Sequence, residues 1–330
     1  KAENLTIIGL GSTLEVDELD LTGTLNILES GCLTSHSTTT TTEHSLTVNS
    51  ETINIDSTSR IDVSNRGYCK GRTLNNVSWN SETCGGSYGG YGGMRTGDRC
   101  DVYGDFMNPN ELGSGAGNQG SGGSGGGLIR LTAESLVLDG KILANGQIYR
   151  SNRDNASGGS GGGIKISVNN ISGNGSISSN GGSGSYKYGD GSGGGGGRIA
   201  VYYKNGNFSW NNITAYGGSA RINWFGGEGT VYIKNETTGA QKMLFNNNNL
   251  LPQYSTPVWF GERGDTSDDP AEFGVSIISG EKASCYFESA ITGIHMNDFI
   301  VDGGAYFSCY GSFKAENLTI IGLGSTLEVD

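Results

Sequence analysis

The first seventeen residues of the chain, Lys1–Asp17, recur without a change as its last seventeen, Lys314–Asp330. Chance does not produce so long an identity, and diverged repeats carry substitutions, so the segment marks a period of 313 residues followed by the start of the next. Fixed-period self-similarity is typical of solenoids and arrays, and this period is far longer than one solenoid coil. The sequence therefore predicts a tandem array whose period contains several smaller coils.

The smaller coils are clearest in the middle of the chain. Three related units, GGSGGGLIRL, GGSGGGIKIS and GGGGGRIAVYY, begin at Gly122, Gly158 and Gly193. Each continues with short strand-forming runs separated by Asp-Gly or Asn-Gly turns. The first strands of successive units recur at a nearly constant spacing, marked by Ile129, Ile164, Ile199 and Val231. Whole units that recur in register indicate coils stacked on one another.

Shorter coils flank this middle region. SIISGEKASCYF from Ser276, FIVDGGAYFSCY from Phe299 and TIIGLGSTLEV from Thr319 align with one another from their first residues. Further runs start at Thr24 and Ser45, where Ile, Leu and Val alternate with polar residues. Such alternation indicates strands with one buried and one solvent-facing side. We expect these coils to continue across the repeated segment.

Composition narrows the class of protein. Glycine supplies 59 of 330 residues and proline only 4, but glycine does not recur at every third position as in collagen. No helical period is apparent, and no apolar run approaches the roughly 20 residues of a membrane span. The net charge of −12, with no Lys and Arg cluster, argues against nucleic acid as a partner. The sequence predicts an all-β fold, a right-handed parallel β-helix solenoid with loop insertions.

The pattern changes along the chain and divides it into five predicted regions. They are β-helix coils over 1–66, a Cys-, Gly- and Tyr-rich insertion over 67–120, Gly-rich coils over 121–245, an Asn-, Pro- and Asp-rich loop over 246–273, and coils over 274–330 that run into the next repeat. Loops on one face of a solenoid are where binding contacts are usually made.

The glycine-rich units beginning at Gly122, Gly158 and Gly193 resemble the coils of large secreted β-helix proteins, pectin-lyase-like in architecture, of microbial and protist cell surfaces. The resemblance covers about two thirds of the chain. It implies a structural, adhesive or carbohydrate-contacting role and carries over no catalytic residue.

The six cysteines suggest disulfides and an oxidising compartment. Cys285 and Cys309 lie in the aligned runs SCYF and FSCY, so we expect them to stack on adjacent coils at a separation that a disulfide tolerates. The alternative is a pair of buried thiols. Pairings of Cys84 with Cys100 and of Cys32 with Cys69 would complete the set. A zinc site is disfavoured, because no CxxC occurs and the histidines lie far from the cysteines in sequence.

Sequons for N-glycosylation are frequent, and we expect them at outward corners of the coils. They are Asn4, Asn76, Asn155, Asn170, Asn174, Asn207, Asn212, Asn235 and Asn317. The threonine run 38–42 is either an O-glycosylated segment or a flexible polar loop.

Two further patterns lie in the second loop region. Arg263-Gly264-Asp265 matches the tripeptide that integrins recognise, and Asp265, Asp268 and Asp269 are candidate Ca²⁺ ligands, with a solvated acidic loop as the alternative. Some parallel β-helices cleave acidic polysaccharides with paired carboxylates. In this chain Asp268 and Asp269 form such a pair, but no suitable histidine or basic partner follows them. We therefore expect no enzymatic activity.

These observations predict a non-catalytic, glycosylated structural unit of an extracellular filament or surface appendage, joined head to tail to copies of itself. About ten coils of roughly 4.8 Å would advance each period by about 50 Å. The alternative is a carbohydrate-binding or adhesive surface module on the same scaffold. Its aromatic platforms would come from Tyr88, Tyr91, Tyr202, Tyr203, Trp210 and Trp224.

Overall fold

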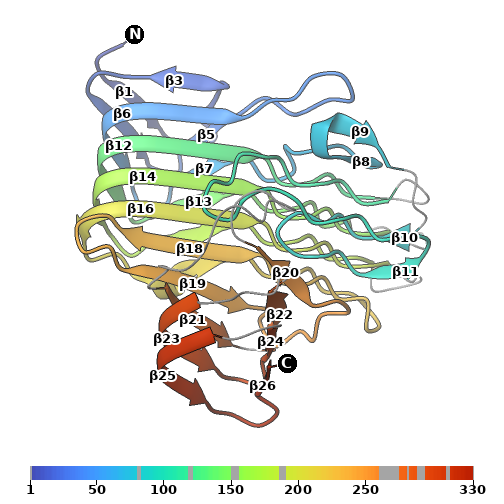
Figure 1. Ribbon diagram of the computed structural model, residues 1–330. Helices are drawn as coiled ribbons and strands as arrows, with labels where there is room; N and C mark the ends of the chain where they lie inside the picture. Colours follow the sequence, from blue (N-terminus) through green and yellow to red (C-terminus); the bar gives the residue numbers. More distant parts are fainter. Residues whose placement is uncertain are drawn as a thin grey trace.

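The computed structural model shows a chain made almost wholly of β-strands, stacked in parallel along one axis (Figure 1). The structure describes residues 2–79, 83–117, 122–149, 156–185, 191–259, 275–280, 282–287, 294–309 and 313–329. The all-β prediction is confirmed for these residues.

The main sheet takes one strand from each level of the stack. Its order is β1 (Leu5–Ile8), β4 (Thr24–Leu28), β6 (Leu46–Ile55), β12 (Leu128–Leu138), β14 (Gly163–Ser172), β16 (Arg198–Gly206), β18 (Thr230–Asn235), β19 (Gln241–Asn246), β21 (Val275–Gly280), β23 (Ile294–Val301) and β25 (Phe313–Ile320), with β3 (Glu18–Asp20) also paired to β6. Neighbours on this path are parallel except β18 and β19.

Two smaller parallel sheets lie across from the main sheet. The second sheet has the order β17 (Ile213–Thr214), β15 (Ser176–Ser178), β13 (Lys141–Leu143), β7 (Arg60–Asp62), β5 (Cys32–Thr34) and β2 (Thr13–Glu15). The third sheet has the order β20 (Thr256–Val258), β22 (Ser284–Phe287), β24 (Tyr306–Cys309) and β26 (Thr326–Val329). Outside them lie the antiparallel pairs β8 (Arg72–Thr73) with β9 (Val77–Ser78) and β10 (Thr83–Cys84) with β11 (Met94–Thr96), and the 3₁₀ turns η1 (Leu74–Asn76) and η2 (Trp210–Asn212).

The predicted alignment of the middle units is the strand register of the structure. Ile129 pairs with Ile164, Ile164 with Ile199, and Ile199 with Val231. These four side chains are at most 4% exposed and stack in the aliphatic core, the buried Ile, Leu and Val between the main and second sheets. The predicted spacing of the middle coils is confirmed.

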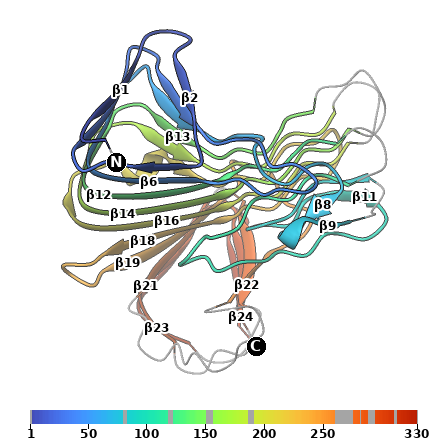
Figure 2. The ribbon, with the colours of Figure 1, turned by 90° about the horizontal axis from the view of Figure 1, so that it is seen from above.

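Between β18 and β19 the chain reverses and the core changes sides. The two strands pair antiparallel. In β16, Ile199 and Val201 belong to the aliphatic core, whereas Ala200 between them belongs to a second cluster on the opposite face. This aromatic core, which includes Phe299 and Phe307, lies between the main and third sheets. Viewed along the stack, the early and late coils lie on opposite sides of the main sheet (Figure 2). This reversal was not predicted from the sequence.

The predicted alignment of the C-terminal coils is wrong by one position per coil. It places Phe299 between Ser276 and Thr319, whereas in the structure Phe299 pairs with Ile277 and Leu318. Phe299 is 1% exposed in the aromatic core. Because side chains alternate with a period of two, the predicted register would have turned this phenylalanine away from the core.

Beyond the strands, the glycine-rich runs of successive coils pack backbone against backbone. A Cβ atom added at Gly194 would lie 2.0 Å from the carbonyl oxygen of Gly159, and one at Gly218 would lie 2.0 Å from that of Gly182. Gly194 donates its N–H to Gly182, and Gly218 donates to Gly194. We call this the glycine layer, formed by residues 85–93, 113–117, 122–127, 156–163, 181–184, 191–197, 217–218 and 226–229.

Two parts of the segment predicted as an insertion, residues 85–93 and 113–117, belong to this layer. Gly89 and Gly90 both donate backbone hydrogen bonds to the carbonyl oxygen of Gly196, at 3.0 and 2.9 Å. A Cβ atom at Gly195 would lie 1.9 Å from the carbonyl oxygen of Gly90. Residues 85–93 therefore close the layer against coils that come much later in the sequence.

Candidate functional sites at the terminal coils

The two copies of the repeated segment occupy opposite edges of the stack. The first copy supplies β1 and β2, and the second supplies β25 and β26. β1 and β25 are the two edges of the main sheet, while β2 and β26 are edges of the second and third sheets (Figure 1). The segment can therefore form a terminal coil in either place.

Identical residues differ in burial between the two copies. Ile7 is 6% exposed, whereas its counterpart Ile320 is 46% exposed. β1 pairs only with the coil that follows it, through β4, and β25 only with the coil that precedes it, through β23. Each copy lacks the neighbour that the other has.

One carboxylate and two imidazoles form a cluster near the end of β2, where the first copy of the repeated segment ends. Asp17 precedes β3, and His36 follows β5 on the next coil. β2 and β5 pair in parallel, with Thr13 beside Cys32, and this register makes Asp17 and His36 stacked neighbours. Asp17 accepts the backbone N–H of His36 at 3.0 Å.

A compact threonine turn brings His44 back to the same carboxylate. Thr39 Oγ1 accepts the backbone N–H of Thr42 at 3.0 Å, and the Thr39 N–H donates to the Thr42 carbonyl at 2.8 Å. Thr38 is 4% exposed, and its hydroxyl oxygen accepts the backbone N–H of His44 at 3.1 Å. Thr38 therefore packs in the interior, while a flexible loop and O-glycosylation both stay predictions for the exposed threonines of this run.

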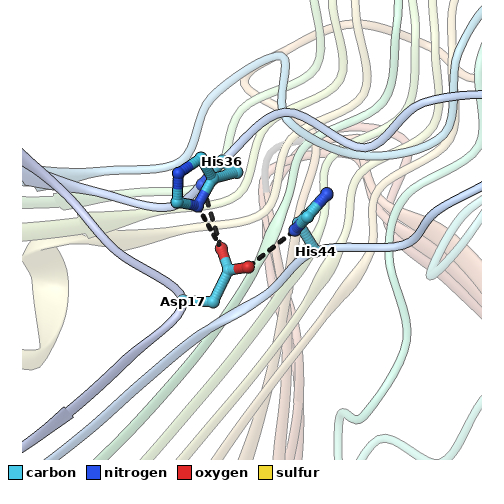
Figure 3. Close-up of side chains that lie close together, drawn as sticks. All are labelled: Asp17, His36 and His44. Atoms are coloured by element: carbon cyan, nitrogen blue, oxygen red, sulfur yellow. Dashed lines mark hydrogen bonds and ion pairs between the residues drawn. The ribbon is translucent and has the colours of Figure 1, made fainter.

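Both imidazoles direct Nδ1 at Asp17 (Figure 3). His36 Nδ1 lies 3.1 Å from Oδ1, and His44 Nδ1 lies 2.6 Å from Oδ2. The three side chains can present ligand atoms within 4.8 Å of one another. Partial burial of Asp17 acts against it, but the hydrogen bonds from His44 and His36 hold the pKa of this carboxyl below its usual value. The cluster thus joins an ionised carboxylate to two imidazoles, which are ligand types that transition metals accept.

A polar cavity of about 280 Å³ adjoins His44. Its lining includes Tyr68, Glu111 and Arg130. Arg130 donates from Nε to Asn110 Oδ1 at 2.8 Å, and Glu111 Oε2 accepts the hydroxyl of a buried tyrosine at 3.1 Å. Burial lowers the pKa of the Arg130 guanidinium. The cavity offers donors and acceptors of the kind that polar ligands use.

The cysteine predictions are corrected by strand register. Cys285 pairs with Phe307 and Cys309 with Val329, so the two cysteines are not stacked partners on β22 and β24. None of the six cysteines, all within the described ranges, is disulfide-bonded, so the pairs Cys84 with Cys100 and Cys32 with Cys69 are absent as well. Burial raises the pKa of the Cys100 thiol, which disfavours the reactive thiolate.

The described sequons lie at the surface to different degrees. Asn76 and Asn235 are half-buried, and Asn155 lies outside the described residues. The exposed ones are Asn4, Asn170, Asn174, Asn207, Asn212 and Asn317. Asn212 donates from its amide to the carbonyl oxygen of Asn174 at 3.2 Å, so these two share one corner on adjacent coils. The predicted corner placement is met there.

The remaining predicted sites are the acidic loop and the aromatic platforms. Arg263, Gly264, Asp265, Asp268 and Asp269 all lie outside the described residues. As for the aromatic platforms, two of the tyrosines are in the interior, where side chains cannot meet a ligand at the surface. These are Tyr88, 0% exposed, and Tyr91, 2% exposed.

Other predicted platform residues stack on one another. The Tyr203 ring lies 4.8 Å from the Trp210 ring, and the Tyr202 ring lies 5.8 Å from the Tyr232 ring on the next coil. Trp224 is half-buried beside the glycine layer, where its carbonyl oxygen accepts the N–H of Gly193. These contacts, one within a coil and one between coils, favour packing over a ligand platform.

Comparison with protein-family models, with curated proteins and with solved structures found no match to this chain. In the part of the chain that the structure describes, no helix has the length and apolar character needed to cross a bilayer. Functional inference therefore rests on the geometry of the molecule itself.

Proposed function

We propose that this chain is one period of a right-handed parallel β-helix that forms the structural rod of an extracellular filament, without catalytic activity. The observation that carries the proposal is that one identical segment supplies the terminal coil at each edge of the stack. A coil that appears at both ends can belong to two consecutive periods at once.

The pairing partners of the two copies are compatible with this double role. In the first copy, Leu5 and Ile7 pair with Leu25 and Ile27. In the second copy, the counterpart of Ile7 is Ile320, which pairs with Val301 on the opposite side of the strand. A junction coil would use both sides at once, so its edge groups would be hydrogen-bonded and its aliphatic side chains covered.

The reversal between β18 and β19 sets the geometry of the proposed rod. Strand direction and core side change together, and the two changes leave the hand of the winding unaltered. Together they amount to a half turn about the stack axis. Successive periods would therefore face opposite sides of the filament. The ten strand spacings from β1 to β25 give a rise of about 48 Å per period.

Small-angle X-ray scattering on chains of one and two consecutive periods tests the proposal. We expect a rigid rod whose longest dimension grows by about 48 Å with the second period. Ile320→Asn at the shared coil should break the rod into two hinged bodies. Ile321→Asn is the matched control, because Ile8 and Ile321 are exposed in both copies, at 49% and 51%. Two freely jointed bodies in the unsubstituted chain would contradict the proposal.

The cavity beside His44 supports a second candidate function, a carbohydrate-binding or adhesive module. Arg130 and the neighbouring carboxylates could hydrogen-bond a sugar. A glycan array probed with a single period separates the two functions. Binding that Arg130→Ala abolishes would favour the module, whereas a silent array would favour the rod alone.

Glycosylation and an extracellular location belong to the same proposal. Exposed Asn170, Asn174 and Asn212 lie at or next to one corner of adjacent coils, where branched sugars would keep neighbouring rods apart. We expect the intact mass of the chain, secreted from a eukaryotic host, to fall on N-glycosidase treatment and to fall less after all three are changed to Gln. An unchanged mass would contradict this part of the proposal.

A further inference from the structure

We propose that Asp17, His36 and His44 form a binding site for a divalent transition metal, with Zn²⁺ as the best match. The ligand set would be one carboxylate and two imidazoles, leaving one position for water. Nothing in the proposed filament requires this site, and it stands on the local geometry alone.

The ligand atoms of the three side chains converge. Zn–N and Zn–O distances near 2.0 Å place the ligand atoms of a tetrahedral site about 3.3 Å apart. His36 Nδ1 lies 3.1 Å from Asp17 Oδ1, already close to that separation. Figure 3 shows the second ring nitrogen of each histidine pointing away from the carboxylate. The Nδ1 atoms would therefore be the ligands, and the proton that each Nδ1 donates to Asp17 in the metal-free chain would give way to the metal, leaving each neutral ring protonated on Nε2.

Backbone hydrogen bonds and strand pairing place these side chains. Asp17 is held by its carbonyl oxygen, which accepts the Thr47 N–H at 2.8 Å. His36 is fixed by the stacking of β5 on β2, and His44 by its backbone hydrogen bond to Thr38. Ligands fixed before binding lose little conformational freedom when a metal arrives.

The three side chains are accessible from solvent. The side chains of His36, Asp17 and His44 are 53%, 39% and 24% exposed. A metal can therefore enter from solvent and keep a water as its fourth ligand, without unfolding of the loop. The cysteines are not needed, which separates this site from the zinc chemistry that the sequence analysis considered.

The site would also fasten two parts of the chain. Asp17 ends the repeated segment, while His36 and His44 lie on the 35–45 loop of the following coil. If periods are joined as proposed, each shared coil carries one such aspartate, and a bound metal would tie every junction to the loop beyond it.

The experiment titrates Zn²⁺ into a metal-stripped single period in the presence of a chromogenic chelator, and repeats it with Co²⁺ to record the visible bands of a four-coordinate ion. We expect one equivalent to bind, and His36→Ala, His44→Ala and Asp17→Asn each to weaken binding at least tenfold. His295→Ala is the matched control, because it removes the one histidine outside the cluster.

Circular dichroism must show that each variant keeps the β-fold, and Asp17→Glu, which retains a carboxylate, should bind more tightly than Asp17→Asn. Absence of stoichiometric binding by the unsubstituted chain would overturn the proposal. So would an equal loss of affinity in His295→Ala. Because the assay uses one period, its failure leaves the scattering test of the filament unaffected.

Discussion

The aliphatic core and the glycine layer both exclude water, but they fill space with different atoms. In the aliphatic core, side chains such as Ile164 and Ile177, both 0% exposed, interdigitate between two sheets. In the glycine layer the backbones themselves pack against one another, and even the polar residues Ser160 and Ser192 are 0% exposed. One region therefore depends on apolar side chains, and the other depends on their absence.

The difference determines which forces stabilise each region. Burial of apolar surface, worth about 25 cal/mol per Å², stabilises the aliphatic core. The glycine layer gains little of this, so its peptide groups must pair with one another. Gly161 donates to Gly195 and Gly126 to Ser160, each at 2.9 Å. We expect removal of side-chain atoms to destabilise the aliphatic core, and addition of side-chain atoms to destabilise the glycine layer.

Gly195→Ala should give the largest effect. The new methyl group would lie 1.9 Å from the carbonyl oxygen of Gly90, and no flexible side chain stands there to move aside. We expect a loss above the usual range for overpacking, more than about 4 kcal/mol, because two backbones must separate. Urea unfolding measures it.

The matched control is Gly280→Ala. Among the residues that the structure describes, no atom lies within 4 Å of a Cβ built at Gly280, and the φ of Gly280 is not in the left-handed region. Its stability should match that of the unsubstituted chain. Equal effects at Gly195 and Gly280 would show that the glycine layer is not packed as described.

Removal of atoms from the aliphatic core comes next in size. Ile164→Ala deletes a fully buried side chain between Ile129 and Ile199, and we expect a loss of about 3 kcal/mol from lost transfer energy and the cavity left behind. Ser167→Ala on the outward face of the same strand should change the unfolding free energy by less than about 0.5 kcal/mol. Calorimetry or urea unfolding of both variants would reveal whether the two faces differ in this way.

The same contrast explains what the sequence could predict. The register from Ile129 to Val231 was predictable because apolar side chains recur at the coil step. The glycine layer was not, because glycine carries no side-chain pattern from which a partner can be inferred. The reversal did leave a signal: RIAVYY in β16 lacks alternation, as expected for a strand buried on both faces.

The candidate metal site shows the same limit. Two of the three histidines, His36 and His44, lie close together in the sequence, which is a usable signal. Their link to Asp17 depends on the register between β2 and β5 and on the threonine turn, neither of which composition reveals. The cysteine prediction failed for a related reason, since a small error in the coil step places Cys309 beside Cys285, where the structure has Phe307.

The glycine layer also differs from the aliphatic core in holding a buried ionisable group, and pH tests this. Burial raises the pKa of Glu228, which is 0% exposed, from 4.5 to about 8. Below pH 4.5 the Glu228 carboxyl is neutral in both the folded and the unfolded chain. Above pH 4.5 it ionises in the unfolded chain but stays neutral in the folded chain, so the free energy of unfolding falls as pH rises toward 8.

The loss attributable to Glu228 should approach about 3 kcal/mol between pH 4.5 and pH 7, since one pKa unit corresponds to about 1.4 kcal/mol. Glu228→Gln should remove this part of the pH dependence and be the more stable chain at pH 7. Urea unfolding at several pH values measures the difference between the two chains. Parallel curves would mean that Glu228 is solvated.

The smallest effect is expected where the two regions meet. Asn180 follows β15 and leads into a glycine run, and its side-chain Oδ1 accepts the backbone N–H of Tyr216 on the next coil at 2.8 Å. Its own N–H donates to Asn145 Oδ1 on the preceding coil at 2.7 Å. The two asparagines thus form a ladder along one corner. In each, the side-chain oxygen accepts a backbone N–H from the next coil.

Asn180→Ala should cost about 1 kcal/mol, because the half-buried Tyr216 N–H loses its acceptor while the strands on either side keep theirs. Asn180→Asp, which retains an acceptor oxygen, should recover part of the loss. Amide hydrogen exchange gives the local readout: we expect faster exchange at Tyr216 in Asn180→Ala, with Ile177 in the adjoining strand unchanged. Faster exchange at both would mean that the corner ladder, rather than the apolar side chains, holds the strands of the second sheet in register.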